Sequence, residues 1–181
     1  MAEPLKTARL IIERQRVRHA DLVYEAQRHS ALYTYIPQEP MTLEALRDRY
    51  RFLEAGVSPD GNEHWLNWIA FCEQSGRPVA TFQATIPVSG HGAIAYSVFP
   101  PFWKQGYATE LSQSMLTHLF EHYTPTALSA EIDTRNTASI RLVEKLGFTR
   151  TAFTADADFF KGTSSDEYRY TLTRKEWLKR T

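Results

Sequence analysis

The sequence has little cysteine, no long hydrophobic run and no excess of charge of either sign. Its single cysteine, Cys72, allows neither an intrachain disulfide nor a zinc site built on several cysteines, so we expect a reducing compartment, the cytoplasm. No apolar run approaches the ~18 residues of a membrane span, and the charged N-terminus lacks the apolar region of a signal peptide. Lys+Arg and Asp+Glu both number 21, which excludes a broadly basic surface for nucleic acid. We therefore expect no membrane or nucleic-acid partner.

The length and charge distribution favour one domain. Domains usually run to about 100–200 residues, and the sequence has no repeat, low-complexity tract or flexible linker, so residues 1–181 are predicted to fold as a unit. Residues 52–103 carry one basic and four acidic side chains, a local charge of 1 − 4 = −3. This excess indicates either a pocket that attracts a cation or, more simply, scattered solvated carboxylates.

Hydrophobic periodicity and turn residues predict a mixture of helices and strands. Strands are predicted at residues 9–14, 65–72, 79–88, 92–99, 128–133, 148–153 and 168–172. Helices are predicted at residues 19–30, 43–56, 109–124, 137–146 and 173–179. The first half is mostly antiparallel hairpins and the second half alternates strands and helices, which indicates an α+β fold.

A loop between a predicted strand and the long helix could bind an anion. It reads Trp-Lys-Gln-Gly-Tyr-Ala-Thr-Glu over residues 103–110. Free backbone N–H groups at a helix N-terminus bind phosphate oxygens, and Gly106 would let the backbone approach closely. The segment matches neither the Walker pattern nor the three-glycine dinucleotide fingerprint. From these residues alone, a phosphate site and an ordinary tight turn remain equal alternatives.

A second motif begins at Asn136 and reads Asn-Thr-Ala-Ser-Ile-Arg-Leu-Val-Glu-Lys-Leu-Gly-Phe. By itself it is typical of a capped amphipathic helix. Following the first motif by one helix and one strand, however, it resembles the GNAT (Gcn5-related N-acetyltransferase) superfamily, specifically its RimJ/RimL-like branch. The strand Thr7-x-Arg9-Leu10 and the closing Asp166-x-Tyr168 also resemble the ends of that branch.

The resemblance implies an acetyl-CoA-dependent N-acetyltransferase. The expected fold is a three-layer α+β domain with a mixed, mostly antiparallel central sheet flanked by helices, whose strands splay apart at the acetyl-CoA cleft. The amine acceptor, a protein N-terminus or a small molecule, would attack the thioester directly in a ternary complex. No metal is expected, and the chain would be a monomer or a homodimer. Carried onto this sequence, the acetyl-CoA-binding residues are Tyr96, Ser97, Val98, Lys104, Gln105, Gly106, Tyr107, Ala108, Thr109, Asn136 and Ser139.

The resemblance also implies roles for the tetrahedral intermediate and the thiolate. A backbone N–H near Val98 would stabilise the oxyanion. Many GNAT enzymes place an acidic Tyr where this sequence has Val143, so that role is unfilled. In the RimL-like branch a serine serves the thiolate, and Ser139 matches it. Because a free serine is a poor acid, we expect Ser139 to donate a hydrogen bond to the sulfur.

The general base is less clearly indicated. Many relatives carry a glutamate where this sequence has Ala93. The RimL-like pattern offers instead a carboxylate before an aromatic residue and a turn glycine, which Asp158 matches, although Asp158 could equally be a solvated turn residue. His91 is the reserve candidate because its ordinary pKa of about 6.5 suits base chemistry.

Two alternatives to catalysis by Ser139 and Asp158 stay open. A GNAT fold that binds CoA without transfer would explain the missing glutamate and tyrosine. The sequence His118-x-x-Glu121-His122 matches a pattern of zinc peptidases, which would imply a zinc-dependent hydrolase. The acceptor would contact the first two helices, residues 33–37 and the 156–165 turn. The nearby aromatic residues are predicted to be core or pocket wall: Tyr33, Tyr35, Trp65 and Trp68.

Overall fold

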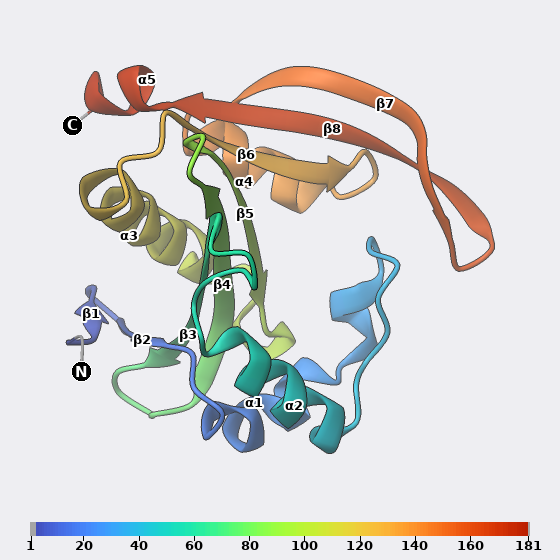
Figure 1. The fold of residues 1–181 in the computed structure, drawn as a ribbon. Helices are drawn as coiled ribbons and strands as arrows, with labels where there is room; N and C mark the ends of the chain where they lie inside the picture. Colours follow the sequence, from blue (N-terminus) through green and yellow to red (C-terminus); the bar gives the residue numbers. More distant parts are fainter. Residues whose placement is uncertain (1–2, 181) are drawn as a thin grey trace.

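One sheet of eight strands runs through the described part of the chain, residues 3–180 of a computed structural model (Figure 1). The strand order is β1-β2-β3-β4-β5-β6-β8-β7, and among these strands β5 and β6 pair in parallel while the other neighbours are antiparallel. The strands are β1 (Leu5–Lys6), β2 (Leu10–Arg14), β3 (Glu63–Cys72), β4 (Pro78–Pro87), β5 (His91–Val98), β6 (Ala127–Asp133), β7 (Thr149–Phe160) and β8 (Thr163–Thr173). This confirms the predicted mixed, mostly antiparallel α+β fold.

Helices cover both faces of the sheet. They are α1 (His19–Gln27), α2 (Leu43–Leu53), α3 (Tyr107–His122), α4 (Thr137–Lys145) and α5 (Arg174–Leu178), with short 3-10 turns at Ser30–Tyr33 and Pro100–Phe102. Neighbouring residues of β3 belong to two different cores, because successive side chains of a strand point to opposite faces. Trp68 packs in the core that contains α3 and α4, whereas Ile69 packs in the core that contains α1 and α2.

The long helix α3 forms because its apolar side chains repeat every four residues. Leu111, Met115 and Leu119 are at most 1% exposed and face the sheet. The helix begins at Tyr107, two residues before the predicted start, because Gly106 takes the N-cap position with a left-handed φ of 83°. The predicted stop near Thr124 is confirmed, since α3 ends at His122.

The sheet opens between β5 and β6. The two strands pair over three positions only, the last of them Ala93 with Ser129. Beyond Ala93 the rest of β5 has no strand on that side, so the predicted splay of the central strands is confirmed. In the described chain, no helix is long and apolar enough to cross a membrane.

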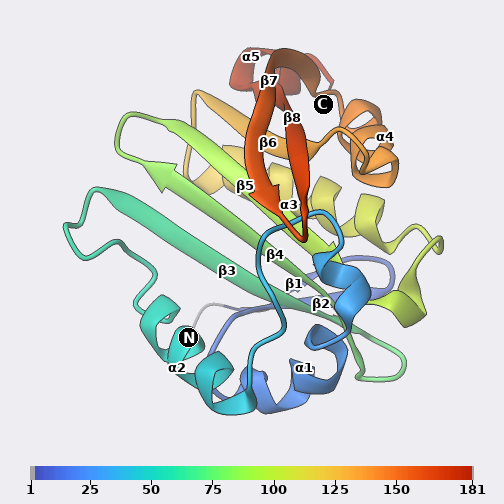
Figure 2. The same cartoon turned by 90° about the vertical axis from the view of Figure 1, so that its right-hand side faces the viewer.

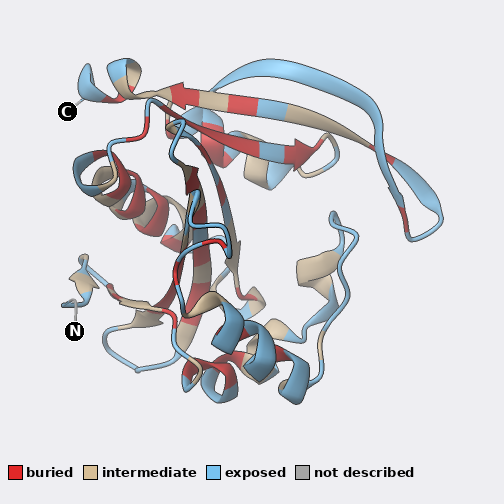
Figure 3. Cartoon of the chain, viewed as in Figure 1, coloured by how far each residue is buried: buried red, intermediate tan, exposed pale blue. Residues whose placement is uncertain are grey.

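The last two strands are much longer than predicted. β7 continues after residue 153 and β8 begins before residue 168, and the added lengths form a twisted two-stranded arm that reaches the segment after α1 (Figure 2). All but the last residue of β7 are exposed (Figure 3), so its sequence lacks the apolar alternation by which half-buried strands are recognised. A two-residue turn at Lys161 and Gly162, with φ values of 52° and 75°, joins the strands. Such consecutive left-handed residues are typical of tight hairpins.

Candidate active site

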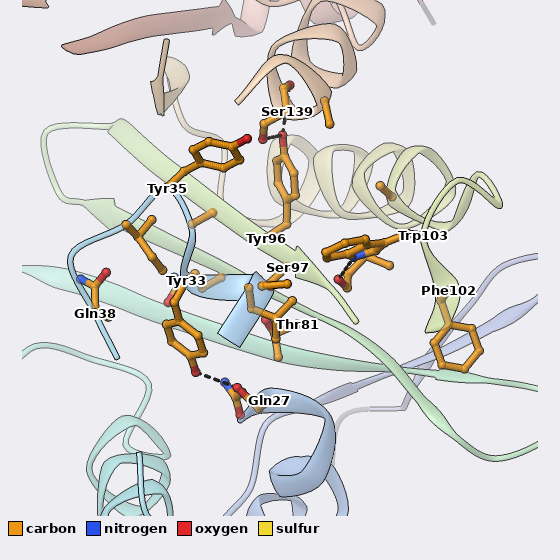
Figure 4. Close-up of a pocket in the computed structure, with 18 of the residues that line it drawn as sticks. Gln27, Tyr33, Tyr35, Gln38, Thr81, Tyr96, Ser97, Phe102, Trp103 and Ser139 are labelled. Atoms are coloured by element: carbon orange, nitrogen blue, oxygen red, sulfur yellow. Dashed lines mark hydrogen bonds between the residues drawn. The ribbon is translucent and has the colours of Figure 1, made fainter. Parts of the chain in front are cut away.

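A cavity of about 790 Å³ lies at the point where β5 separates from β6 (Figure 4). Its walls come from the open end of β5, the loop before α3, the first turn of α4, and the segment from α1 to α2. Figure 4 shows Tyr96 and Ser139 at one end, and Gln27 and Tyr33 at the other. The cavity therefore joins two halves of the chain that are far apart in sequence.

The open edge of β5 presents backbone groups to this cavity. The Phe99 N–H donates to the Val79 carbonyl at 2.8 Å, which places alternate backbone groups on the β4 side. The same alternation turns the N–H groups of Tyr96 and Val98 to the side where β6 has left the sheet. An extended, amide-containing ligand could therefore add to this edge as a further strand does.

The N–H groups at the junction of the preceding loop with α3 have no acceptor within the helix. Two residues of this loop have left-handed backbone, Lys104 with φ 57° and Gly106 with φ 83°. An added Cβ at Gly106 would meet the Arg9 guanidinium at 3.5 Å, an ordinary contact, so conformation rather than space favours glycine there. The first turn of the 16-residue helix α3 and its dipole point at this end of the cavity, which suits phosphate oxygens.

The connection between β1 and β2 holds this loop in place. Glu110, in the first turn of α3, accepts hydrogen bonds from Thr7 Oγ1 at 2.6 Å, the Arg9 N–H at 2.8 Å and Arg9 Nε at 2.7 Å. The Arg9 guanidinium also donates to the Gln105 carbonyl at 3.0 Å and lies 4.2 Å from the centre of the Tyr107 ring. Burial alone would raise the pKa of Glu110, but the hydrogen bonds from Thr7 and Arg9 outweigh it and lower that pKa.

A hydroxyl pair marks the opposite wall of the same end. Tyr96 Oη lies 2.8 Å from Ser139 Oγ, and burial raises the pKa of Tyr96 to about 12, which the hydrogen bond with Ser139 opposes. Asn136 caps α4 by accepting the Ser139 N–H at 3.2 Å. The spacing Asn-x-x-Ser is thus a helix cap that fixes the serine beside the tyrosine.

Comparisons with known proteins agree with this geometry. Residues 9–149 match the model of the Acetyltransferase (GNAT) domain family. The chain belongs to the GNAT family.

Relatives and solved structures match over nearly the whole chain. An "Uncharacterized N-acetyltransferase p20" from Bacillus licheniformis is 23% identical and covers 97% of this chain and 98% of its own length. A ribosomal-protein-S5-alanine acetyltransferase structure from Vibrio fischeri has a TM-score of 0.84 at 12% identity, covering 97% and 99% of the two chains. A spermidine N-acetyltransferase structure from Vibrio cholerae, in complex with CoA and spermine, has a TM-score of 0.83 at 15% identity, covering 95% and 99%. At these identities the two structures show that the fold is shared.

Most of the residues predicted to bind acetyl-CoA line the cavity of this GNAT domain. These are Tyr96, Ser97, Val98, Lys104, Gly106, Tyr107, Ala108, Asn136 and Ser139. Gln105 and Thr109 do not line it. The Gln105 side chain turns back and donates to the Pro101 carbonyl at 2.9 Å, which stabilises the loop. Val143, at the position of the tyrosine in many GNAT enzymes, is fully buried in the core.

The candidate bases lie outside the cavity. Asp158 is an exposed residue of the β7 arm, and its carboxylate accepts the N–H of Phe159 at 2.7 Å. It was expected in a turn, but it belongs to a strand, because β7 extends past it to Phe160. His91 pairs with Ala127 at the closed end of β5. Neither residue lines the cavity.

The three residues of the zinc-peptidase pattern, which was only an alternative, lie on α3 and not in the cavity lining. His118 packs edge-on against Trp68, and His122 Nδ1 lies 3.1 Å from the His118 carbonyl. Among residues 3–180, no three His, Cys, Asp or Glu side chains are grouped so as to hold a metal ion.

The acidic residues behind the local charge of −3 have other partners or positions. Glu54 pairs with Arg16 and Glu73 with Lys6. Asp60 accepts hydrogen bonds within its own turn, and Glu63 accepts from the Trp65 indole at 2.8 Å. Since none of the four lines the cavity, the charge excess reflects scattered carboxylates and not a cation-binding pocket.

The far end of the cavity contains side chains that the sequence analysis does not name, although most of them come from the two predicted helices where it expects the acceptor. They include Gln27, Arg28, Met41 and Arg49, from α1, α2 and their connection. Tyr33 lines the cavity there and Tyr35 lines it nearer Ser139 (Figure 4), whereas Trp68 is core and Trp65 lies outside the lining. The residue patterns of α1 and α2 are those of ordinary amphipathic helices, so they do not distinguish the cavity-lining side chains from other surface side chains.

Proposed function

We propose that this chain transfers the acetyl group of acetyl-CoA to a primary amine by direct attack. One observation carries the proposal. A single cavity combines a strand edge with free amides, a helix N-terminus with unpaired N–H groups, and the Tyr96–Ser139 hydroxyl pair. Membership of the GNAT family supports it.

The pantetheine arm would lie along the open edge of β5. Its amides would pair with the backbone of Tyr96, because the Val98 carbonyl already accepts the Trp103 indole N–H at 2.5 Å and the Val98 N–H faces the reacting carbonyl. The pyrophosphate would be bound by the N–H groups of the loop from Lys104 to Thr109. The Lys104 ammonium would add one positive charge there. Binding through backbone dipoles that are already in place requires little reorganisation on binding.

The acetyl group would then lie between the N–H of Val98 and Ser139. As the amine attacks the thioester carbon, negative charge moves onto the carbonyl oxygen, which the Val98 N–H stabilises. The C–S bond breaks and the electron pair leaves on sulfur. Ser139, supported by Tyr96, would donate a hydrogen bond to that sulfur.

The phenol of Tyr96 is better suited to donating a hydrogen bond than to giving up its proton. Its pKa is raised to about 12, whereas a free thiol has a pKa of about 8.5. Full transfer from the phenol to the thiolate would therefore cost about 5 kcal/mol. The thiolate would take its final proton from water.

The amine would enter neutral or lose its proton to water. None of the described residues that line the cavity is Asp, Glu or His. This lining favours water over Asp158 and His91 as the proton acceptor. The rate should then rise with pH up to the pKa of the acceptor amine, with no inflection near pH 4–7 that belongs to the protein.

Two measurements test the proposal. Isothermal titration should show binding of CoA, and thiol release from acetyl-CoA should depend on an added amine. Gly106→Ala forces a left-handed alanine into the loop and should raise the KM for acetyl-CoA about tenfold. The matched control Gly76→Ala introduces the same strain (φ 66°) in an open turn outside the cavity lining and should leave KM unchanged. Binding of CoA with no amine-dependent thiol release would instead favour a non-catalytic binding protein.

A further inference from the structure

The end of the cavity farther from Ser139 is lined by cations and neutral hydrogen-bonding groups. It is formed by α1, α2 and the segment between them, and Figure 4 shows Gln27, Tyr33 and Gln38 there. Three described lining residues carry a permanent positive charge: Arg28, Arg49 and Lys104. Lys104 belongs to the loop before α3, so the two arginines are left at the end where an acceptor would enter.

Arg49 is the cavity-facing member of three arginines on α2. Arg47 forms a salt bridge with Asp21 and Arg51 forms one with Asp48. In the described chain Arg49 has no hydrogen bond or ion pair. Leu46, three residues earlier on the same helix face, is buried and lines the cavity, so helical spacing directs Arg49 toward it.

The groups around Arg49 leave further donors available. Tyr50 Oη donates to Gln27 Oε1 at 3.0 Å, which engages the amide oxygen and leaves the amide N–H groups as donors. Tyr33 Oη donates to the Gln27 carbonyl at 2.8 Å. Burial raises the pKa of Tyr33, the charge of Arg49 opposes this rise and the charge of Glu39 adds to it. Glu39 does not line the cavity and is paired with Lys161 at 3.3 Å. Arg28 has one exposed partner, Glu25, at 3.6 Å.

This arrangement is unsuited to a polyamine. A second ammonium group, such as spermidine carries, would lie near Arg28 and Arg49, and the described lining contains no carboxylate to offset their repulsion. A guanidinium without a partner is instead matched by the planar, two-oxygen face of a carboxylate, or by a phosphate.

We propose that the acceptor is a small amine that also carries an anionic group, and that Arg49, assisted by Arg28, binds this group at the α1–α2 end of the cavity. The inference rests on the proposed function and specifies its substrate class. Arg49 is a specificity-determining residue in this proposal, because it binds the acceptor away from the reacting atoms. The reaction would leave the anionic group unchanged and convert the amine to an acetamide.

The test is thiol release from acetyl-CoA with matched amines. Each free amino acid of a panel is compared with its decarboxylated amine, aminoethyl phosphate is compared with ethanolamine, and spermidine is included. We expect the carboxylate- or phosphate-bearing member of a pair to have the higher kcat/KM. The amino acid and phosphate arms distinguish the two sources of charge.

Variants of α2 then assign the effect to Arg49. Arg49→Gln should raise the KM for the acceptor with the anionic group 10- to 100-fold, the range expected for a lost charged hydrogen bond. It should leave unchanged the KM for the matched amine that lacks this group and the KM for acetyl-CoA. Arg49→Lys should recover part of the loss. The matched control Arg51→Gln, on the same helix but outside the cavity lining, should change neither KM. Thermal unfolding of each variant separates loss of fold from loss of binding.

The outcomes are distinct. A preference for spermidine or for the decarboxylated amines, with acetyl transfer intact, would overturn this inference and leave the proposed function standing. Equal effects of Arg49→Gln and Arg51→Gln would overturn it as well. Absence of transfer to any amine would overturn both.

Discussion

The Tyr96–Ser139 pair allows a sharp test of the chemistry. Tyr96 Oη and Ser139 Oγ are 2.8 Å apart, although Tyr96 lies on β5 and Ser139 lies on α4, 43 residues later in the sequence. If Ser139 stabilises the thiolate while Tyr96 orients and polarises its hydroxyl, the two should act as one unit. Residues that act as a unit show strongly non-additive effects on the rate.

The perturbations are Tyr96→Phe, Ser139→Ala and the double variant. A hydrogen bond to a charged group contributes about 1.5–3 kcal/mol, so Ser139→Ala should lower kcat about 10- to 100-fold. Tyr96→Phe leaves Ser139 in place but removes its partner, so we expect a smaller loss, about 1 kcal/mol or fivefold. The double variant should be no slower than Ser139→Ala, which corresponds to a coupling energy of about 1 kcal/mol.

The assay is steady-state thiol release at saturating acetyl-CoA, with CoA affinity measured separately. Val143→Ala, a fully buried core change next to the same helix face, serves as the control for loss of packing: it should lower thermal stability with a smaller effect on kcat. Additive losses in the double variant would contradict the shared role. So would a loss of less than twofold in Ser139→Ala.

Three further predictions concern the loop, the arm and the end of α4. Glu110→Gln should destabilise the fold by about 1–2 kcal/mol and weaken acetyl-CoA binding, because glutamine places a donor against Arg9. Since folding lowers the pKa of Glu110, its contribution to stability is complete above its ordinary pKa of 4.5 and is lost as the pH falls through the folded pKa. Urea unfolding of the variant at a series of pH values should therefore lack this part of the acid dependence. Lys161→Met removes the salt bridge with Glu39 at 3.3 Å and the contacts of the ammonium with the carbonyls of Tyr33 at 2.7 Å, Ile36 at 2.8 Å and Gln38 at 3.3 Å. It should raise the KM for the acceptor several-fold while Lys175→Met, on α5, does not; an equal effect on the KM for acetyl-CoA would contradict a role confined to the α1–α2 end of the cavity. Gly147→Ala should destabilise the fold by about 1–2 kcal/mol and lower the melting temperature, because Gly147 has a left-handed φ of 95°, whereas the flexible Arg180 side chain can move away from an added Cβ; an unchanged melting curve would refute this reasoning.

The parts of the fold that were predicted correctly have signals within a few consecutive residues. The stripe of α3 repeats every four residues, and Asn136 and Gly147 cap the two ends of α4, so the patterns located these helices to within a few residues. The resemblance to GNAT proteins rests on the same two segments. Local sequence was sufficient there because the local hydrogen bonds and the apolar face determine the structure.

The β7–β8 arm and the individual side chains at the α1–α2 end of the cavity could not be predicted in this way. Eleven residues of β7 are exposed, so no burial pattern marked the strand, and Asp158 was expected in a turn. Lys161 contacts the Tyr33 carbonyl across 128 residues of sequence. Gln27, Arg28 and Arg49 come together through the packing of α1 on α2, and no spacing within either helix records that contact.

The charge balance of the chain and the charges of its cavity have a common explanation in the proposed function. Acetyl-CoA is a polyanion, but the loop before α3 offers it backbone N–H groups and one lysine, so the protein needs no excess of Lys and Arg to bind it. The arginines at the other end of the cavity are then not required for the cosubstrate. Because the other arginines of α2 are paired with aspartates, the exposed and unpaired Arg49 at the cavity wall is the one whose charge is available to a ligand with a negative group.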